Sequence, residues 1–386
     1  MIKVGMLADL PYRREDYYRG GVLQANYRLV KALARVEELR LTVLSPCHHI
    51  TRTETHRDKN ASIIFWPRPR HDALQLFRGL RRALSTLLSD SQPDLVHASH
   101  TPSYIFAALH GRLPSIVTVH GVFRNELPLV KNRSSITERL RTLALCRLED
   151  HNFSQIRNLI AITSEIERLV KACSPSVRVF RIDNTIDDEF FTLPDEQLHP
   201  IILFVGWISY RKGIHLLLQA FEALSLDIPG IQLRIVGLEE ADPNYGISLR
   251  KSYADLVAAR SVSFLGGISQ EELYREVSRC SLLCLPSLAE SAPMVIAQAM
   301  AAGKPVVASQ VGGIPEMVEH NITGLLFEPG NVSELRDCLT QMLSDKMGRI
   351  CMGRKAKEVA SARYAPDAVA RKTVDAYYEV LHATME

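Results

Sequence analysis

Residues 286–313, PSLAESAPMVIAQAMAAGKPVVASQVGG, contain the pattern that decides the fold of this chain. They read as the end of a strand, a turn carrying Glu290, a helix of small residues, a second strand and a Gly-Gly turn. Pro293 suits the first turn of the helix, where its missing N–H costs nothing. Free N–H groups at a helix start attract phosphate or hydroxyl oxygens, and Gln298 lies further along the same helix. A carboxylate, a helix start and a further polar side chain form the layout that a sugar-diphosphate site requires.

Short apolar runs alternate with helical patterns along the whole chain. Because the runs are continuous in Val, Ile and Leu, they are typical of strands buried on both faces of a parallel sheet. Strands that alternate with helices predict parallel sheets covered by helices on both faces. The predicted strands of the first half are Lys3–Ala8, Leu41–Ser45, Ser62–Trp66, Leu95–Ala98, Ile116–Val119, Leu159–Ile162 and Val177–Arg181, with helices at Val22–Val36, Asp72–Leu88 and Thr137–Phe153. Those of the second half are Ile201–Gly206, Leu233–Val236, Ser263–Leu265, Leu282–Leu285 and Pro305–Ala308, with a helix over Ile314–Glu319.

The same rhythm occurs twice, and a chain of 386 residues is too long for one ordinary core. We predict two Rossmann-like α/β domains that face each other across a cleft, because ligands of such sheets bind at the carboxyl ends of the strands. The acidic segment Asp187–Pro200 marks the boundary, which assigns residues 1–190 and 191–365 to the two domains. Residues 366–386 contain an amphipathic helix, Pro366–Leu381, that we expect to cross back to the first domain. Packing on the second domain alone is the alternative.

The composition limits the class of protein. Hydrophobic residues make up 46% and charged residues 23% of the chain, as in soluble globular proteins. Residues 1–198 hold 28 Lys and Arg against 22 Asp and Glu, and the rest of the chain holds 18 against 21. This excess favours an anionic partner for the first half, with ordinary surface scatter as an equal alternative.

Cysteine usage and the N-terminus indicate the compartment. The seven cysteines include no C-x-x-C pair, so they predict neither a disulfide framework nor a zinc site, and those at 280 and 284 are expected in the core. A reducing, cytoplasmic setting fits this usage. Residues 1–9, MIKVGMLAD, read as a strand rather than a signal peptide, and no apolar run is long enough to span a membrane.

Two turns ahead of predicted helices have residues that suit a phosphate. Gly20 and Gly21 open the first helix, where glycines let a backbone come close to an anion; an ordinary flexible turn is the alternative. No G-x-G-x-x-G follows the first strand, which argues against an ordinary dinucleotide site. After the strand that ends at Gly206, Arg211 and Lys212 supply two cations that suit a diphosphate. A solvated basic loop is the alternative there.

Two further features place polar side chains near strand ends. His120 follows the run SIVTV, and a polar residue at the carboxyl end of a strand points toward the ligand side in this fold class. A histidine that caps a loop is the alternative. His97 and His100 also end a strand, and a structural role is the better interpretation for both. For Glu290 and Gln298, a helix cap and a helix-surface residue are the alternatives to ligand binding.

The order of these motifs resembles that of one family, the retaining glycosyltransferases of the GT-B fold known as glycosyltransferase family 4, or group 1. The resemblance is strongest over residues 201–330, where VGWISYRKG is similar to the family's phosphate-binding loop and ESAPMVIAQAMAAGKPVVAS to its E-x7-E segment. RIVGLEE and FLGGISQEELY resemble its nucleotide-contacting segments, and VGGIPEMVEHNITGLLFEPGN its closing signature. GGVLQANYRLVKAL, TVHG, AITSE and DNTID are similar to landmarks of its first domain.

The resemblance implies a role for each matching residue. Lys212 would bind the donor diphosphate, Glu290 would meet the sugar hydroxyls, and His120 would lie beside the transferred sugar, which makes these three the expected catalytic residues. The other expected donor-binding residues are Gly20, Gly21, Arg211, Gly237, Ile268, Pro293, Met294, Val295 and Gln298. Among them, Gly21 would back the diphosphate, and the N–H groups near Met294 and Val295 would bind phosphate. Ile268 would touch the base through its backbone, and position 298 would hydrogen-bond the ribose.

Two residues depart from the family pattern. Trp207 stands where the family usually has an arginine, although Arg211 in the same loop can supply a donor instead. Gln298 replaces the second glutamate of the E-x7-E segment. Its amide still offers an acceptor oxygen to a ribose hydroxyl, without the charge that makes such a bond about twice as strong. We therefore expect weaker donor binding and retained activity.

The resemblance further implies transfer from a UDP- or GDP-sugar to a glycan or lipid-linked acceptor, with retention of configuration and without a metal or cofactor. Polysaccharide or glycolipid biosynthesis would be the context. A sugar-nucleotide 2-epimerase of the same fold and a non-catalytic nucleotide-sugar-binding module are the alternatives. Nucleic-acid binding is not expected, because the basic residues lack interleaved aromatics and the second half is acidic.

A basic segment in the first half suggests contact with a membrane surface. Residues 67–88, PRPRHDALQLFRGLRRALSTLL, combine leucines at helical spacing with several arginines, and Lys131, Arg133, Arg139 and Arg141 add positive charge. Such a helix can lie on anionic lipid at the inner face of the cytoplasmic membrane. A helix packed on its own sheet, with its basic face in solvent, is the alternative.

Overall fold

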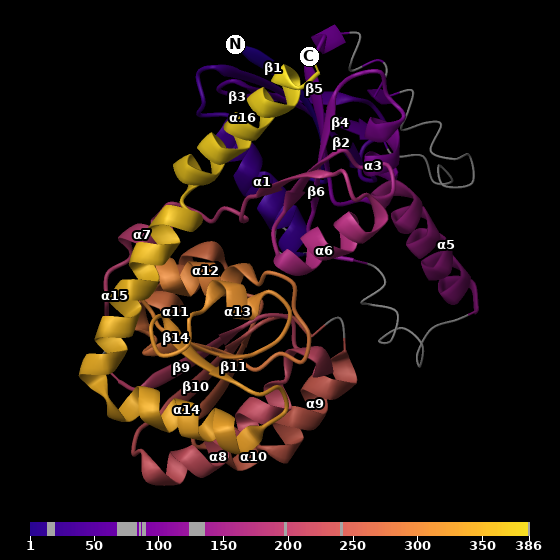
Figure 1. The fold of residues 1–386 in the computed structure, drawn as a ribbon. Coiled ribbons are helices and arrows are strands. Elements are labelled where there is room, and N and C mark those ends of the chain that lie inside the picture. The colour runs from indigo at the N-terminus through magenta and orange to yellow at the C-terminus, as the bar shows by residue number, and fades with distance from the viewer. Residues whose placement is uncertain are drawn as a thin grey trace. The chain divides into compact units, whose positions relative to one another are not determined.

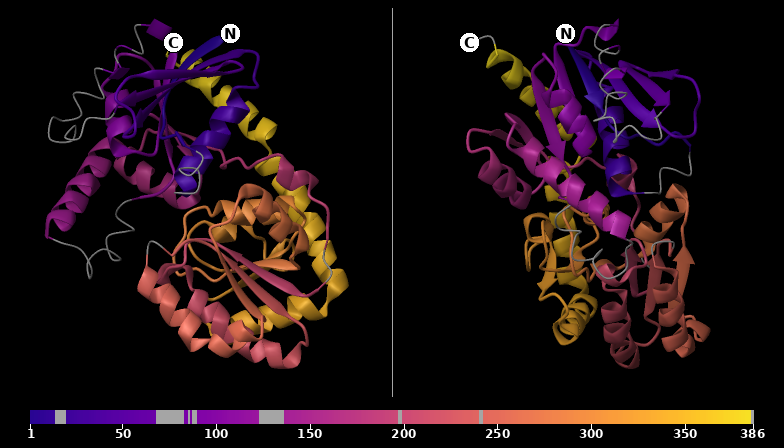
Figure 2. Two further views of the ribbon diagram at one scale, coloured as in Figure 1. Left: turned by 180° about the vertical axis from the view of Figure 1, so that it is seen from behind. Right: turned by 90° about the vertical axis from the view of Figure 1, so that its right-hand side faces the viewer.

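The computed structural model describes residues 1–13, 20–67, 83–84, 86, 90–122, 136–196, 199–239 and 242–384, with only the backbone for 136–142. The chain forms two compact units, Met1–Thr185 with Pro366–Glu386, and Ile186–Ala365 (Figure 1). The first unit therefore contains both ends of the chain (Figure 2). The units divide earlier than the expected limit at residue 190, because Ile186 and Phe190 are fully buried in the core of the second unit.

The first unit is built on one sheet with the strand order β3-β4-β2-β1-β5-β6-β7-β8 among its described residues. Its elements are β1 (Ile2–Leu7), α1 (Gly21–Leu33), β2 (Leu39–Cys47), β3 (Glu54–Asp58), β4 (Ala61–Pro67), β5 (Leu95–Ser99), α3 (Pro102–Leu109), β6 (Ser115–Val119), α5 (Ile136–Phe153), β7 (Asn158–Ala161), α6 (Ser164–Cys173), β8 (Arg178–Arg181) and α16 (Pro366–His382). Neighbouring strands are parallel except β3, which pairs with β4 in antiparallel register. The prediction of purely parallel sheets is wrong at this edge. The sequence of β3, ETHRD, is polar and exposed, so it has no apolar run that would reveal a strand.

The second unit is built on a parallel sheet with the strand order β11-β10-β9-β12-β13-β14. Its elements are α7 (Glu189–Thr192), β9 (Ile201–Val205), the 3-10 helix η3 (Tyr210–Lys212), α8 (Ile214–Asp227), β10 (Gln232–Val236), α9 (Pro243–Ser252), α10 (Ala254–Ala258), β11 (Val262–Gly266), α11 (Gln270–Arg279), β12 (Leu282–Leu285), α12 (Met294–Ala301), β13 (Val306–Ser309), α13 (Ile314–Met317), β14 (Gly324–Phe327), α14 (Val332–Ser344) and α15 (Lys346–Arg363). The expected strands are present with boundaries shifted by a few residues. The fully buried strand β14, with the sequence GLLF, was not predicted.

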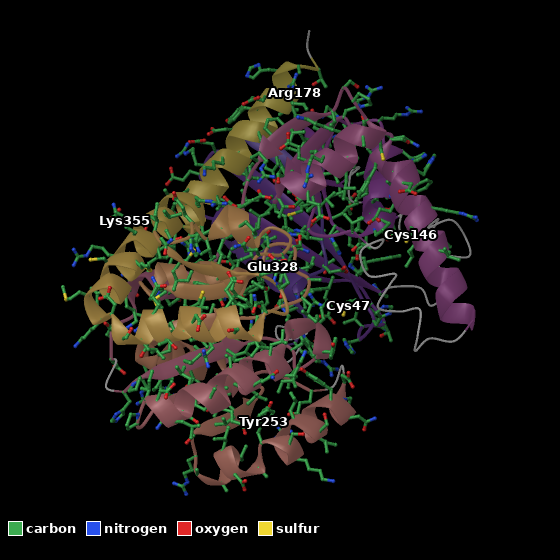
Figure 3. The ribbon with its side chains drawn as sticks, turned by 60° about the horizontal axis from the view of Figure 1, so that its bottom comes forward. Cys47, Cys146, Arg178, Tyr253, Glu328 and Lys355 are labelled. Carbon is green, nitrogen blue, oxygen red and sulfur yellow. The ribbon has the colours of Figure 1, made fainter. Side chains whose placement is uncertain are left out.

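The last helix, α16, belongs to the first unit, so the predicted return of the chain is confirmed. It packs on α1 (Figure 1), and its Val369, Val374 and Tyr377 are buried in the core of that unit. At its far end, the Arg178 side chain donates a hydrogen bond to the carbonyl oxygen of Glu379 at 3.0 Å (Figure 3).

Each sheet has one place where the strand order reverses. In the first sheet, the chain leaves β1 toward β2 and returns to its other side as β5. In the second sheet, it leaves β9 toward β10 and returns as β12. Loops at the carboxyl ends of such a strand pair diverge to opposite faces and leave a crevice, which is where open α/β sheets bind ligands. These two switch points are the places to look for a site.

The basic segment proposed for membrane contact lies almost entirely outside the described residues, as do Lys131 and Arg133. Arg139 and Arg141 lie within α5, where only the backbone is described. Among the helices that the structure describes, none combines the length and the apolar character that crossing a bilayer requires.

Candidate functional site

The switch point of the second sheet brings together two loops that are far apart in the sequence. β9 and β12 are hydrogen-bonded neighbours, with Leu282 opposite Ile202, although β10 and β11 lie between them in the chain. The loop after β9 passes through η3 into α8, and the loop after β12 leads into α12. Both loops therefore start side by side at the carboxyl edge of the sheet.

Gly213 allows the first loop to touch the second. Its φ of 67° is in the left-handed region, and a Cβ atom there would lie 1.9 Å from the carbonyl oxygen of Pro286. Any side chain would therefore force the loops apart. With the two loops in contact, the N–H of Leu288 donates to the carbonyl oxygen of Arg211 at 2.7 Å.

Gly312 allows the loop after β13 to touch the loop after β12. Its φ is 54°, and a Cβ atom there would lie 1.7 Å from the carbonyl oxygen of Glu290. The N–H of the next residue, Gly313, donates to the carbonyl oxygen of Ser291 at 2.8 Å. The loops after β9 and β13 thus both touch the loop after β12, which contains Glu290.

The centre of this arrangement is a buried ion pair between Lys212 and Glu290. The lysine Nζ lies 2.5 Å from the glutamate Oε1, and only 11% and 7% of the two side chains are exposed. The Ser287 hydroxyl donates to the same Oε1 at 2.7 Å. Arg211 donates to the carbonyl oxygen of Ala289 at 2.6 Å, and its Nη1 lies 3.7 Å from Glu290 Oε2. Two cations and one carboxylate are therefore held together at the end of the sheet.

The helix α12 starts one residue later than the sequence predicted. Pro293 is its N-terminal cap, with an extended ψ of 110°, and so it is not in the first turn; the first helical residue is Met294. The first N–H groups of a helix have no partner within it, so the amides at Met294 and Val295 come from the position expected for a phosphate contact. Gln298 lies on the same helix with 5% exposure, and its side-chain amide bonds to none of the described residues.

The ends of β10 and β11 extend the same edge of the sheet. The N–H of Gly237 donates to the carbonyl oxygen of Gly266 at 2.9 Å. A Cβ atom at Gly237 would lie 1.8 Å from the carbonyl oxygen of Gly206, so the packing of these loops already requires a glycine there. Ile268 follows β11 and is half-buried against the core of the second unit.

The structure unites residues that the sequence had assigned to separate tasks. Lys212 was expected on the diphosphate and Glu290 on the sugar, yet the two side chains bind each other directly. Ser287 was not predicted as part of the site. Its position three residues before Glu290, in a turn after an apolar strand, is the signal that could have identified it.

His120 lies in the first unit, directly after β6, and it is buried. Its Nε2 is 3.1 Å from the hydroxyl of Ser99, and its ring meets the His100 ring edge-on at 5.8 Å. Burial, with smaller contributions from the neighbouring His100 and His97, lowers the pKa of His120 to about 3, although a hydrogen bond with Asn184 acts in the opposite direction. The ring is therefore neutral at physiological pH.

His120 also lines a small pocket within the first unit. The pocket lies at the carboxyl ends of β6, β7 and β8, and Thr118 and Asn184 contribute polar atoms to it. Thr373 of α16 closes one side. His120 thus lies at the carboxyl end of its strand, and its contact with a sugar stays a prediction.

Gly20 and Gly21 begin α1, as predicted for a turn that opens a helix. Gly20 has an extended φ of 170°, and a Cβ atom there would meet nothing within 4 Å. Neither backbone strain nor packing against described residues thus requires a glycine at this position. The close approach of a ligand stays the predicted reason for a glycine at position 20.

His97 has the structural role that was expected. It is fully buried, and its two ring nitrogens lie 2.8 Å from the hydroxyl of Tyr377 and 2.7 Å from that of Thr118. Burial lowers its pKa to about 3. His97 thereby ties α16 to the sheet of the first unit.

Known proteins resemble this chain in both halves. Residues 185–359 match the family described as Glycosyl transferases group 1, and residues 19–190 match the one described as Glycosyltransferase Family 4. A Mycobacterium tuberculosis protein, GDP-mannose-dependent alpha-(1-6)-phosphatidylinositol monomannoside mannosyltransferase, is 31% identical over 183 residues, which are 46% of this chain and 46% of that protein. The chain thus spans about half the length of this curated relative.

Solved structures share the fold over nearly the whole chain. Sucrose-phosphate synthase from Thermosynechococcus elongatus has a TM-score of 0.77 and 20% identity, covering 99% of this chain and 100% of that one. HepE of Anabaena in complex with UDP-glucose has a TM-score of 0.70 and 20% identity, covering 98% and 100%. These likenesses confirm the predicted pair of Rossmann-like domains. The two family matches, which together run from residue 19 to residue 359, show that this chain belongs to the group 1 glycosyltransferases, glycosyltransferase family 4.

Proposed function

We propose that this chain is a glycosyltransferase that moves a sugar from a nucleotide-sugar donor to an acceptor hydroxyl. The buried pair of Lys212 and Glu290 carries the proposal, because it offers a cation for a diphosphate and a carboxylate for sugar hydroxyls beside the start of α12. The Anabaena protein with the same fold was solved with UDP-glucose. A UDP- or GDP-sugar is the proposed donor.

Each residue of the site has a task in this proposal. An ammonium group has three N–H donors, so Lys212 can keep its bond to Glu290 and still donate to a phosphate oxygen. Arg211, whose side chain is 36% exposed, is the second cation for the diphosphate. The Glu290 oxygens accept from sugar hydroxyls, and Gln298 accepts from a ribose hydroxyl. The amides at Met294 and Val295 bind a phosphate oxygen.

The proposed reaction retains the configuration of the sugar. The acceptor oxygen forms its bond to the anomeric carbon on the face from which the diphosphate oxygen departs. The proton of the acceptor hydroxyl passes to that departing oxygen, so no protein nucleophile is needed. Negative charge develops on the diphosphate, and fixed cations such as Lys212 stabilise it because they are already oriented before the reaction.

The proposed reaction is independent of a metal, because Lys212 and Arg211 supply the positive charge that a divalent cation supplies at other diphosphate sites. Activity should be unchanged after treatment with EDTA. Loss of activity in EDTA that Mg²⁺ restores would overturn this part of the proposal.

A panel of UDP-, GDP- and ADP-sugars, incubated with the protein with and without candidate acceptors, tests the function. Release of nucleotide that an acceptor stimulates is the expected result. Isomerised sugar without transfer would indicate an epimerase instead, and binding without turnover would indicate a non-catalytic module. Either of these two outcomes would overturn the proposal.

The proposed acceptor is a glycan or a lipid-linked sugar, reached at the cytoplasmic face of a membrane. The basic leucine-containing segment 67–88 supports this location, as does the name of the mycobacterial relative, which refers to a phosphatidylinositol monomannoside. Sedimentation with anionic vesicles at low salt, compared with neutral vesicles, measures the contact. Absence of binding to anionic vesicles would remove the membrane part of the proposal.

A further inference from the structure

A chain of buried polar groups leads from the switch point of the first sheet to His120, which follows the neighbouring strand β6. Asn26 of α1 donates from its Nδ2 to the backbone carbonyl oxygen of Asp9, just beyond β1, at 3.2 Å. Ser99, the last residue of β5, donates its hydroxyl hydrogen to Asn26 Oδ1 at 2.6 Å. The same hydroxyl oxygen lies 3.1 Å from His120 Nε2. Asn26 and Ser99 are both 1% exposed, so water does not compete for these bonds.

Counting hydrogens along this chain determines which ring nitrogen of His120 carries the proton. A backbone carbonyl oxygen can only accept, so the Asn26 amide must direct its nitrogen to Asp9 and its oxygen to Ser99. Ser99 has a single hydroxyl hydrogen, and this hydrogen is used on Asn26. The bond between Ser99 and His120 can then form only if His120 Nε2 donates.

We propose that Asn26 and Ser99 are positioning residues that hold His120 in the Nε2–H tautomer, so that its Nδ1 is the acceptor nitrogen. In the complex with substrate, the hydrogen that Nδ1 accepts comes from a sugar hydroxyl. The part that concerns substrate rests on the proposed glycosyl transfer. The part that concerns the tautomer rests only on the bonds within the first unit.

The neutral state of the ring makes the tautomer the property that matters. Because burial keeps the imidazole uncharged, it has one N–H and one acceptor nitrogen at physiological pH. If the proton moved to Nδ1, the ring would present a donor where a sugar hydroxyl hydrogen needs an acceptor. The network anchored on Asp9 prevents this exchange.

Two substitutions separate this role from general support of the fold. In Asn26→Leu, the hydroxyl hydrogen of Ser99 loses its acceptor and turns to His120 Nε2, which imposes the opposite tautomer. We expect kcat/KM to fall on the order of tenfold, as when a group that orients a histidine is lost. In the double variant Asn26→Leu with Ser99→Ala, the wrong donor is gone, so part of the activity should return. Ser99→Ala alone is the remaining variant of this double-mutant cycle.

Nitrogen-15 NMR of the histidine-labelled full chain reads the tautomer without any substrate. The spectrum of His120→Gln identifies the His120 signals by their absence. The wild type should show a protonated Nε2, and Asn26→Leu should show a protonated Nδ1. Ser45→Ala is the control, because Ser45 is an equally buried serine of the same sheet that accepts from the N–H of Leu10 and does not contact His120.

The outcomes are distinct. Nε2–H in the wild type and higher activity of the double variant than of Asn26→Leu would support the proposal. Nδ1–H in the wild type, or a double variant no more active than Asn26→Leu although both are folded, would overturn it. If the wild type transfers no sugar while the spectrum shows Nε2–H, the proposed function fails and the tautomer assignment holds.

Discussion

At the scale of single residues, the bond between Lys212 and Glu290 joins two charges that are both largely removed from water. Removing ions from water costs several kcal/mol each, and the attraction within the pair offsets this only when other bonds satisfy the remaining atoms. Ser287 supplies one such bond to Glu290. A bound diphosphate would supply others to Lys212, which is why a pair of this kind suits an anion site better than a purely structural contact.

Replacing Lys212 by alanine tests this assignment. Lys212→Ala should lose about 3 kcal/mol of transition-state stabilisation, the loss expected for one fixed donor to a developing negative charge. The corresponding fall in kcat/KM is roughly a hundredfold. Transfer at the wild-type rate would contradict the assignment.

A matched control exists in the same unit. Lys304 is 3% exposed and lies 2.5 Å from Asp195, in an ion pair as short as that of Lys212 but outside the site. Lys304→Ala should lower the stability of the second unit while the turnover of the folded fraction stays near the wild-type value. A similar loss of turnover in both variants would show that the effect is not specific to the donor site.

A substitution at Gln298 is expected to keep or improve donor binding rather than weaken it. Gln298→Glu should keep or improve donor affinity in calorimetric titrations, because a carboxylate makes a stronger bond to a ribose hydroxyl than an amide does. Without the nucleotide, the buried charge should lower the thermal stability, since its desolvation is not compensated. A collapse of affinity in this variant would show that the pocket is not used as in the rest of the family.

At the scale of elements, the turn from η3 into α8 positions the cations. Helix α8 begins directly after Gly213, whose left-handed backbone reverses the chain against Pro286. The tight contact determines where Arg211 and Lys212 lie relative to the loop after β12. The glycine is therefore needed for the ion pair as well as for the turn.

Gly213→Ala and Gly230→Ala form a matched pair. Both glycines have positive φ, 67° and 77°, but a Cβ atom at Gly230 would meet nothing within 4 Å. Urea unfolding should show a loss of about 1–2 kcal/mol for Gly230→Ala, the cost of the left-handed backbone alone. Gly213→Ala should lose clearly more and should also weaken donor binding. Equal losses in the two variants would mean that the contact with Pro286 relaxes without consequence.

At the scale of the whole molecule, the chain begins and ends in the same unit, so the last helix is part of the first core. Ending the chain at Ala365 removes Val369, Val374 and Tyr377 from that core and leaves His97 without its partner on α16. Hydrogen exchange should then show loss of protection in the first unit and retained protection in the second. Ending the chain at His382 instead is the control and should change little; equal behaviour of both truncations would contradict the role of α16.

Acid should destabilise the first unit, because this unit contains two histidines that are buried in their neutral form. The pKa values of His97 and His120 are about 3 in the folded protein, against an ordinary value of 6.5. The unfolded chain therefore binds more protons between these values, so stability falls as the pH drops from about 6.5 toward 3, by up to about 1.4 kcal/mol per pH unit for each histidine. Urea titrations at several pH values measure this slope, and His97→Gln should reduce it. A stability that is constant from pH 7 to pH 4 would contradict both shifts.

The local sequence pattern was sufficient to predict an element wherever the pattern lies within a single segment. The strands with continuous apolar runs were predicted within a few residues, because burial on both faces leaves no other composition. Polar β3 at the sheet edge was missed because it has no such run, and β14, whose run is GLLF, was missed as well. The start of α12 was placed one residue early, since the rule for proline does not distinguish a cap with extended ψ from a first helical residue.

The sequence by itself determined that this chain forms two Rossmann-like domains, and it located the strand ends at which Lys212, Glu290 and His120 lie. Only the tertiary structure decided what these residues contact. Lys212 and Glu290 are 78 positions apart and meet because β12 returns beside β9, and the order of strands in a sheet is not encoded in any local pattern. In the same way, the proton on His120 depends on Asn26 and Ser99, which come from a helix and a neighbouring strand. Hydrogen bonds between distant segments are set by the packing of the whole unit, and this is why the chemistry of the site could be anticipated only in part.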